Sequence, residues 1–118
     1  MARKYTGTLL GIESSYGSVY NVITYDKRCH LWKANIVAKY SGKMLKIVFN
    51  WNGESYSLQL SEIKPGYYTG TIFCSNEESG TVYLWQYSNG KDILLKGDFN
   101  EEGAGDFTCF IELRKLSI

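Results

Sequence analysis

The chain has 118 residues, enough for one domain (1–118) that buries a hydrophobic core without metal or disulfide support. Its 13 Lys and Arg residues against 12 Asp and Glu residues give a net charge of +1, which argues against nucleic-acid binding. The three cysteines are an odd number, and no apolar run resembles a signal peptide or a membrane span, so we expect a cytoplasmic protein without a membrane partner.

The composition is typical of an all-β protein, with ten Tyr, three Trp, five Phe and twelve Gly but a single Pro. Apolar and polar residues alternate along most of the chain, and charged residues on the polar positions indicate a solvated sheet face. Turn signals divide this alternation into the following predicted strands: Lys4–Ile12, Gly17–Tyr25, Cys29–Tyr40, Lys43–Trp51, Glu54–Glu62, Tyr67–Cys74, Gly80–Ser88, Lys91–Phe99 and Asp106–Arg114.

Two Asn-Gly dipeptides, Asn52-Gly53 and Asn89-Gly90, predict hairpins with two-residue turns. The first turn predicts the apolar cross-strand pairs Phe49–Tyr56, Ile47–Leu58 and Leu45–Leu60. The second turn predicts the pairs Leu84–Leu95, Gln86–Ile93 and Val82–Gly97.

An internal repeat links the two halves of the chain. Tyr5-Thr6-Gly7-Thr8-Leu9 returns as Tyr68-Thr69-Gly70-Thr71-Ile72, and Gly17-Ser18-Val19-Tyr20 returns as Gly80-Thr81-Val82-Tyr83. The repeat predicts two similar four-strand units, at about 4–51 and 67–114, joined by a linking strand at 54–62. Alternatively, strands of this kind simply begin alike, without any duplication.

A meander of about eight or nine short antiparallel strands favours an up-and-down β-barrel, because closure removes exposed sheet edges. With its meander pattern and its Tyr-x-Gly-x-Leu strand beginnings, the chain resembles the calycin architecture of the lipocalins and avidins. The Gly-x-Trp opening of lipocalins has no counterpart here, so the resemblance assigns no binding residues. A β-sandwich is the alternative fold.

Strand parity predicts polar side chains inside the barrel. It turns Gln86 inward, and it turns Asn21 inward opposite Trp32, with Ile23 opposite His30. A few polar groups in an aromatic lining are typical of a small-molecule pocket, for which we propose the residues Asn21, His30, Trp32, Trp51 and Gln86. Alternatively, these polar groups satisfy one another or lie at a wet end of the barrel.

The same parity predicts a row of aromatic residues on the outer face. Tyr83, Trp85 and Tyr87 share one side of a strand, with Leu94 on the neighbouring strand and Tyr20 at the equivalent place in the first half. Tyr and Trp are typical anchors of protein interfaces, so this face predicts a protein partner or a homodimer. Alternatively, the row packs beneath a loop, or a β-bulge reverses the parity.

The residue patterns give no support to catalysis or to a metal site. His30 and its neighbour Cys29 point to opposite faces of a strand, and no Cys-x-x-Cys occurs. The acidic loop at 98–106 partly fits a calcium-loop spacing, but Cys109 stands where that loop needs a glutamate. We therefore expect no cofactor and no enzyme, but a small-molecule-binding or sensing barrel with its ligand in the interior or mouth. A protein-interaction or regulatory module is the alternative.

Overall fold

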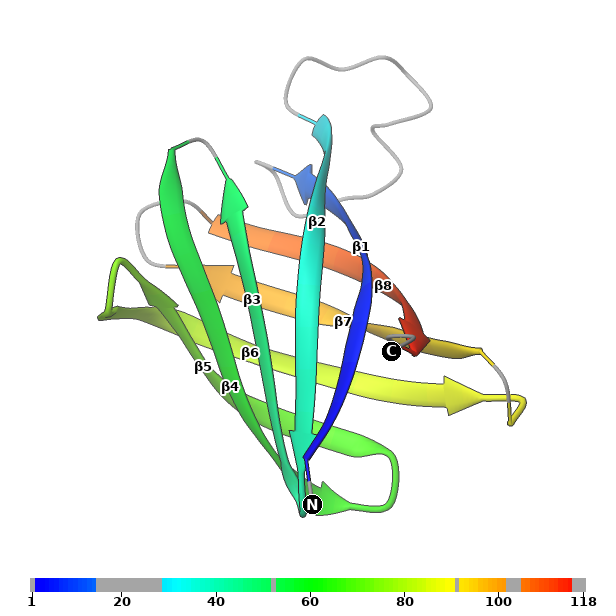
Figure 1. Ribbon diagram of the computed structural model, residues 1–118. Helices are drawn as coiled ribbons and strands as arrows, with labels where there is room; N and C mark the ends of the chain where they lie inside the picture. The colour runs from blue at the N-terminus through cyan, green and yellow to red at the C-terminus, as the bar shows by residue number, and fades with distance from the viewer. Residues whose placement is uncertain (1, 15–28, 52, 91, 102–104, 116–118) are drawn as a thin grey trace.

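The chain folds into a closed β-barrel of eight antiparallel strands, each hydrogen-bonded to its neighbours in the sequence (Figure 1). This computed structural model describes the backbone of residues 2–14, 29–51, 53–90, 92–101 and 105–115, and their side chains except at 2, 10–14, 29–33, 105–107 and 115. The strands are β1 (Ala2–Ser14), β2 (Cys29–Ser41), β3 (Met44–Trp51), β4 (Glu54–Lys64), β5 (Tyr67–Cys74), β6 (Glu77–Ser88), β7 (Ile93–Glu101) and β8 (Gly105–Lys115).

This architecture confirms the predicted all-β meander barrel and excludes the sandwich alternative. The ring closes between the first and last strands, where Leu9 of β1 lies opposite Ile111 of β8. One predicted strand, Gly17–Tyr25, lies outside the described residues. No helix that could cross a membrane occurs among the residues that the structure describes.

The predicted register of the β3–β4 hairpin is confirmed, with Phe49 opposite Tyr56 and Ile47 opposite Leu58. The register predicted for the β6–β7 hairpin is wrong by two residues, because Gln86 pairs with Leu95 and not with Ile93. This turn closes over four residues rather than two: the Asp92 N–H donates to Asn89 Oδ1 at 2.7 Å. A shift of two residues preserves which side chains face inward, since side chains alternate with a period of two.

The pairing of β2 also differs from our prediction. Trp32 lies opposite Gly11 and His30 opposite Glu13, whereas we predicted Asn21 and Ile23 as their partners. The physical reason is that β1 continues to Ser14 and therefore pairs with the first residues of β2.

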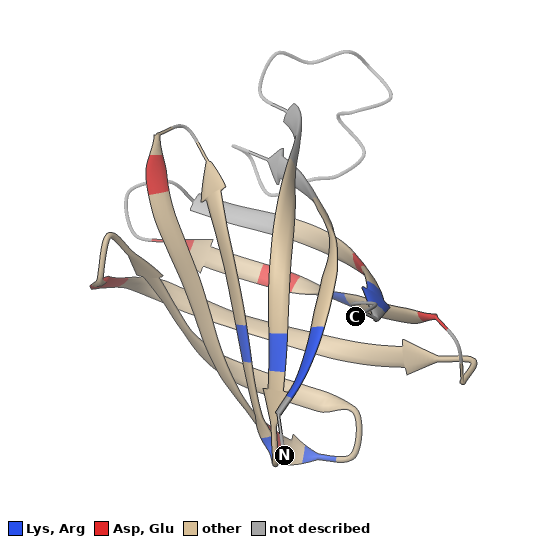
Figure 2. Ribbon diagram, in the orientation of Figure 1, with Lys and Arg blue, Asp and Glu red and all other residues tan. Residues whose placement is uncertain are grey.

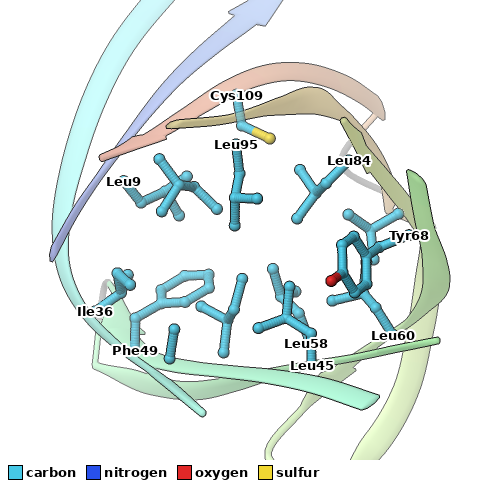
Figure 3. Close-up of a cluster of buried hydrophobic side chains, with 14 of the residues drawn as sticks. Leu9, Ile36, Leu45, Phe49, Leu58, Leu60, Tyr68, Leu84, Leu95 and Cys109 are labelled. Carbon is cyan, nitrogen blue, oxygen red and sulfur yellow. The ribbon is translucent and has the colours of Figure 1, made fainter. Parts of the chain in front are cut away.

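Alternate side chains of every strand fill the barrel interior. Inward-facing apolar residues from all eight strands are buried, and Figure 3 shows several of them pointing toward one another inside the ring. Each fully buried leucine or isoleucine contributes about 1.5–3 kcal/mol relative to an exposed one. Apart from tyrosines and Cys109, none of the described residues with a polar or charged side chain is buried.

The repeat Tyr-x-Gly-x-Leu/Ile has a structural meaning at its glycine. A Cβ on Gly7 would lie 2.0 Å from the carbonyl oxygen of Glu112 in β8, and a Cβ on Gly70 would lie 1.9 Å from that of Gln59 in β4. In each case the neighbouring backbone leaves no room for a side chain.

Candidate functional site

The inward position predicted for Gln86 is observed, at one end of the barrel. The hydroxyl group of Tyr40 donates a hydrogen bond to Gln86 Oε1 at 2.7 Å. The Tyr40 ring makes edge contacts with Tyr5 and Tyr68, at centroid distances of 5.4 and 6.1 Å. Burial raises the pKa of the Tyr40 hydroxyl above its ordinary value, so this group remains a hydrogen-bond donor. The three tyrosines and Gln86 therefore form one cluster at this end of the barrel.

The other predicted lining residues do not gather around Gln86. Trp51 is half-buried and packs on the core at the opposite end of β3, six residues from Leu45, the cross-strand partner of Tyr40. This separation is about 20 Å at roughly 3.3 Å per residue. His30 and Trp32 belong to β2 but their side chains are not described, and Asn21 lies outside the described residues. The ligand site formed by these five residues stays a prediction.

The aromatic residues predicted on the outer face do point outward in the structure. Tyr83, Trp85 and Tyr87 of β6 are 40%, 39% and 54% exposed. Leu94 lies directly opposite Tyr87 on β7 and is half-buried. Tyr20, the remaining residue of the predicted interface, lies outside the described residues.

Two further residues, which our sequence reasoning missed, complete this surface. Tyr67 of β5 lies opposite Trp85, and the centroids of the two rings are 4.2 Å apart. The Nζ atom of Lys64 stands 5.1 Å from the Trp85 ring centroid and 5.4 Å from that of Tyr67, within cation–π range. The repeat contained the signal for Tyr67: its neighbour Tyr68 aligns with the inward Tyr5, so Tyr67 must face outward. We define the aromatic face as Lys64, Tyr67, Tyr83, Trp85, Tyr87 and Leu94.

A hydrogen-bond network fixes one ring of the aromatic face. The Tyr83 hydroxyl donates to Asp98 Oδ2 at 2.5 Å, and Thr108 Oγ1 donates to Asp98 Oδ1 at 3.0 Å. The bond to Asp98 and partial burial raise the pKa of Tyr83 to about 12. The ring is thus held in one orientation before any partner arrives, which lowers the entropy lost on binding.

Charges of both signs surround the aromatic face. Lys96 of β7 lies opposite Trp85, while Asp98 lies opposite Tyr83 on the same strand. Glu112 of β8 lies opposite Leu94. Because the outer positions of β7 and β8 carry both cations and carboxylates, the surface offers complementary charges to a copy of itself.

The described residues show no arrangement suited to metal binding or thiol chemistry. No three His, Cys, Asp or Glu side chains within this part of the chain are gathered as metal ligands. Burial raises the pKa of the Cys109 thiol, and the pKa of Cys74 is also raised, so both thiols favour the unreactive protonated form. In the loop with calcium-like spacing, both carboxylate oxygens of Asp98 already accept hydrogen bonds.

No protein-family model matches the chain, and neither a curated protein nor a solved structure matches it. Its class is therefore defined by its fold: a closed antiparallel meander β-barrel of eight strands with an exposed aromatic face. The narrower likeness to lipocalins and avidins stays an interpretation of this architecture.

Proposed function

We propose that this protein is a non-enzymatic interaction module that pairs with a second copy of itself through the aromatic face. The observation that carries the proposal is the cluster of half-buried Tyr67 with exposed Trp85 and Lys64, whose rings and ammonium group are already in contact. Tyr and Trp are the residues most often found as energetic anchors of interfaces.

A second copy is the occupant that the charges of this surface favour. A twofold interface places the same patch on both subunits, so a patch that holds both cations and carboxylates allows a cation of one copy to pair with a carboxylate of the other. Lys64 and Lys96 provide the cations, and Asp98 and Glu112 the carboxylates. The closed ring leaves no unpaired strand edge between β1 and β8, so association uses side chains on the sheet surface rather than strand addition.

The interior supports the alternative function less well. Leucine and isoleucine side chains are packed through the described part of the lumen, and Tyr40 supplies the partner of Gln86. Binding of a small molecule inside the barrel stays a prediction that depends on Asn21, His30 and Trp32, whose side chains the structure does not describe.

Sedimentation velocity of the wild type and of the variant Trp85→Ala tests the proposal. We expect a concentration-dependent dimer for the wild type and a monomer for Trp85→Ala, since loss of an interface anchor costs about 2 kcal/mol or more. Met44→Ala is the matched control, because Met44 is 50% exposed but lies on β3, outside the aromatic face. A wild type that stays monomeric, or a Trp85→Ala variant that dimerises like the wild type, contradicts the proposal.

A further inference from the structure

A second surface of the barrel carries a row of three lysines that the sequence keeps far apart. Lys4 of β1 lies directly opposite Lys39 of β2, and Lys39 lies directly opposite Lys46 of β3. All three side chains are exposed on the outer face. Figure 2 shows blue segments, which mark Lys and Arg, side by side on β1, β2 and β3. We call these residues the lysine row.

The lysine row is costly in the isolated protein. Neighbouring strands are about 4.8 Å apart, and like charges directly opposite one another destabilise a sheet. The described outer-face positions next to the row hold no carboxylate; they are Thr6, Val37, Ser41, Met44, Val48 and Gln59. Lysines often protect exposed sheet edges, but in a closed barrel these three strands have no edge to protect. An anionic ligand would relieve the repulsion.

An open groove of about 980 Å³ runs over the same face, lined by residues of β8, β1, β2, β3, β4 and β5. Lys46 links the groove to the lysine row, and Arg114 adds a second cation at its β8 side. Asn35 of β2 lines the groove between these two cations, and Gln59 and Ser57 of β4 line it on the far side of Lys46, with the Ser57 hydroxyl itself buried. At its β5 side lies the ring of Phe73.

We infer that the lysine row and this groove bind single-stranded nucleic acid. A cationic track that follows the phosphates, together with an aromatic ring on which a base stacks, is the combination by which sheet surfaces hold single strands. Here the track is Lys4, Lys39 and Lys46, and the stacking ring is Phe73, one strand beyond Gln59 and Ser57. The amides of Asn35 and Gln59 face sugar and base edges.

The net charge of +1 led us to expect no nucleic-acid partner, but it describes the whole chain and not one face of the barrel. The footprint of a nucleic-acid-binding protein is the distribution of its charge, and a basic stripe on one face suffices for it. Among the residues that line the groove, Glu112 is the one described carboxylate. The inference is independent of the aromatic face: its six residues lie on β6, β7 and the adjoining ends of β4 and β5, and none of them lines the groove.

Fluorescence anisotropy of a fluorescein-labelled oligothymidylate of about 12 nucleotides tests the inference, since a site of this kind covers roughly 4–16 nucleotides. At about 50 mM salt we expect binding by the wild type and an affinity at least about threefold lower for Lys39→Gln. Lys43→Gln is the matched control: it removes the same charge from an exposed position in the β2–β3 turn, outside the lysine row. We expect its affinity to equal that of the wild type.

The salt dependence gives a sharper criterion. For single strands the slope of log K against log salt is about −0.7 per phosphate contact, so removing three contacts makes it less steep by about 2. We therefore expect that change for the triple variant Lys4→Gln, Lys39→Gln, Lys46→Gln. Its thermal midpoint should equal or exceed that of the wild type, because the substitutions remove like-charge repulsion. This result separates lost binding from lost folding.

The stacking role of Phe73 is tested with Phe73→Leu, which keeps an apolar side chain but removes the ring. We expect about tenfold weaker binding of the oligonucleotide with an unchanged salt slope, because stacking involves no counterion release. Three results would overturn the inference: no anisotropy change with wild-type protein, equal losses for Lys39→Gln and Lys43→Gln, or binding of an oligoglutamate peptide in place of the oligonucleotide. The last result would assign the lysine row to an acidic protein partner.

Discussion

Tyr40 donates its hydroxyl hydrogen to Gln86 Oε1 across one end of the barrel, at a distance of 2.7 Å. The two residues are 46 positions apart in the chain and belong to β2 and β6. Tyr40 is 3% exposed, so its hydroxyl has little access to water. The bond thus supplies a polar partner that this buried group would otherwise lack.

Because of this bond, we predict that Gln86→Leu destabilises the fold. The substitution leaves the Tyr40 hydroxyl without its partner, a loss that costs about 1–3 kcal/mol. The double variant Tyr40→Phe, Gln86→Leu removes both polar groups and should recover most of that loss. Urea denaturation of the wild type, both single variants and the double variant measures the coupling. A Gln86→Leu variant as stable as the wild type would show that the bond contributes nothing.

Gly70→Ala should destabilise the barrel by about 3 kcal/mol or more, because overpacking against rigid backbone forces β4 and β5 apart. The added Cβ would lie 1.9 Å from the Gln59 carbonyl oxygen. Gly42→Asn is the control: Gly42 has a φ of +61° and no atom within 4 Å of an added Cβ, and Asn tolerates that backbone conformation. We expect thermal unfolding to show a large loss for Gly70→Ala only. Equal midpoints would mean that the two strands separate without cost.

The β5–β6 turn should become more stable when its residues are changed to Asn-Gly. Ser75 and Asn76 both have positive φ values, 52° and 70°, which L-residues adopt at a cost. The double variant Ser75→Asn, Asn76→Gly introduces the residues that such a turn favours and should add about 1 kcal/mol. Ser75→Val, with a β-branched side chain, should lower stability instead. Calorimetry that finds the reverse order would contradict the turn geometry.

The stability of the protein should fall at alkaline pH partly through Tyr83. Its hydrogen bond to Asp98 raises its pKa to about 12. In an unfolded chain tyrosine has a pKa of about 10, so the bond stabilises the fold fully below that pH. The stabilisation is then lost as the pH rises through about 12. Tyr83→Phe lacks the bond at every pH, and its urea midpoint should depend less on pH in this range. If the urea midpoints of the wild type and of Tyr83→Phe depend on pH in the same way, Tyr83 does not cause the loss of stability at alkaline pH.

The inward and outward faces could be predicted because apolar residues alternate along the strands, as in β3, where Leu45, Ile47 and Phe49 leave one parity only. The register was predicted correctly only for the hairpin with a two-residue turn. The pair Asn52-Gly53 closed as predicted, whereas Asn89-Gly90 lies in a longer turn in which Asn89 also bonds with Asp92. A dipeptide signal cannot show how many residues a turn uses.

The candidate sites were predicted in part, for the same reason. Tyr83, Trp85 and Tyr87 lie on one strand, so parity alone grouped them. The contact of Lys64 with Trp85 depends on an irregular pairing between β4 and β5 near Glu62. The alternation of apolar and polar residues does not predict where such an irregularity occurs. The lysine row requires the registers of two strand pairs at once. Such long-range alignments follow from the closed ring and not from local pattern.

Native mass spectrometry of gently purified wild-type protein tests most directly whether the aromatic face or the interior is the functional site. Pairing through the aromatic face predicts a bare dimer, which Trp85→Ala converts to a bare monomer. A monomer carrying an adduct of a few hundred daltons, retained in Trp85→Ala and lost in Gln86→Leu, would contradict our proposal. That outcome would place the function inside the barrel, among the residues predicted around Gln86.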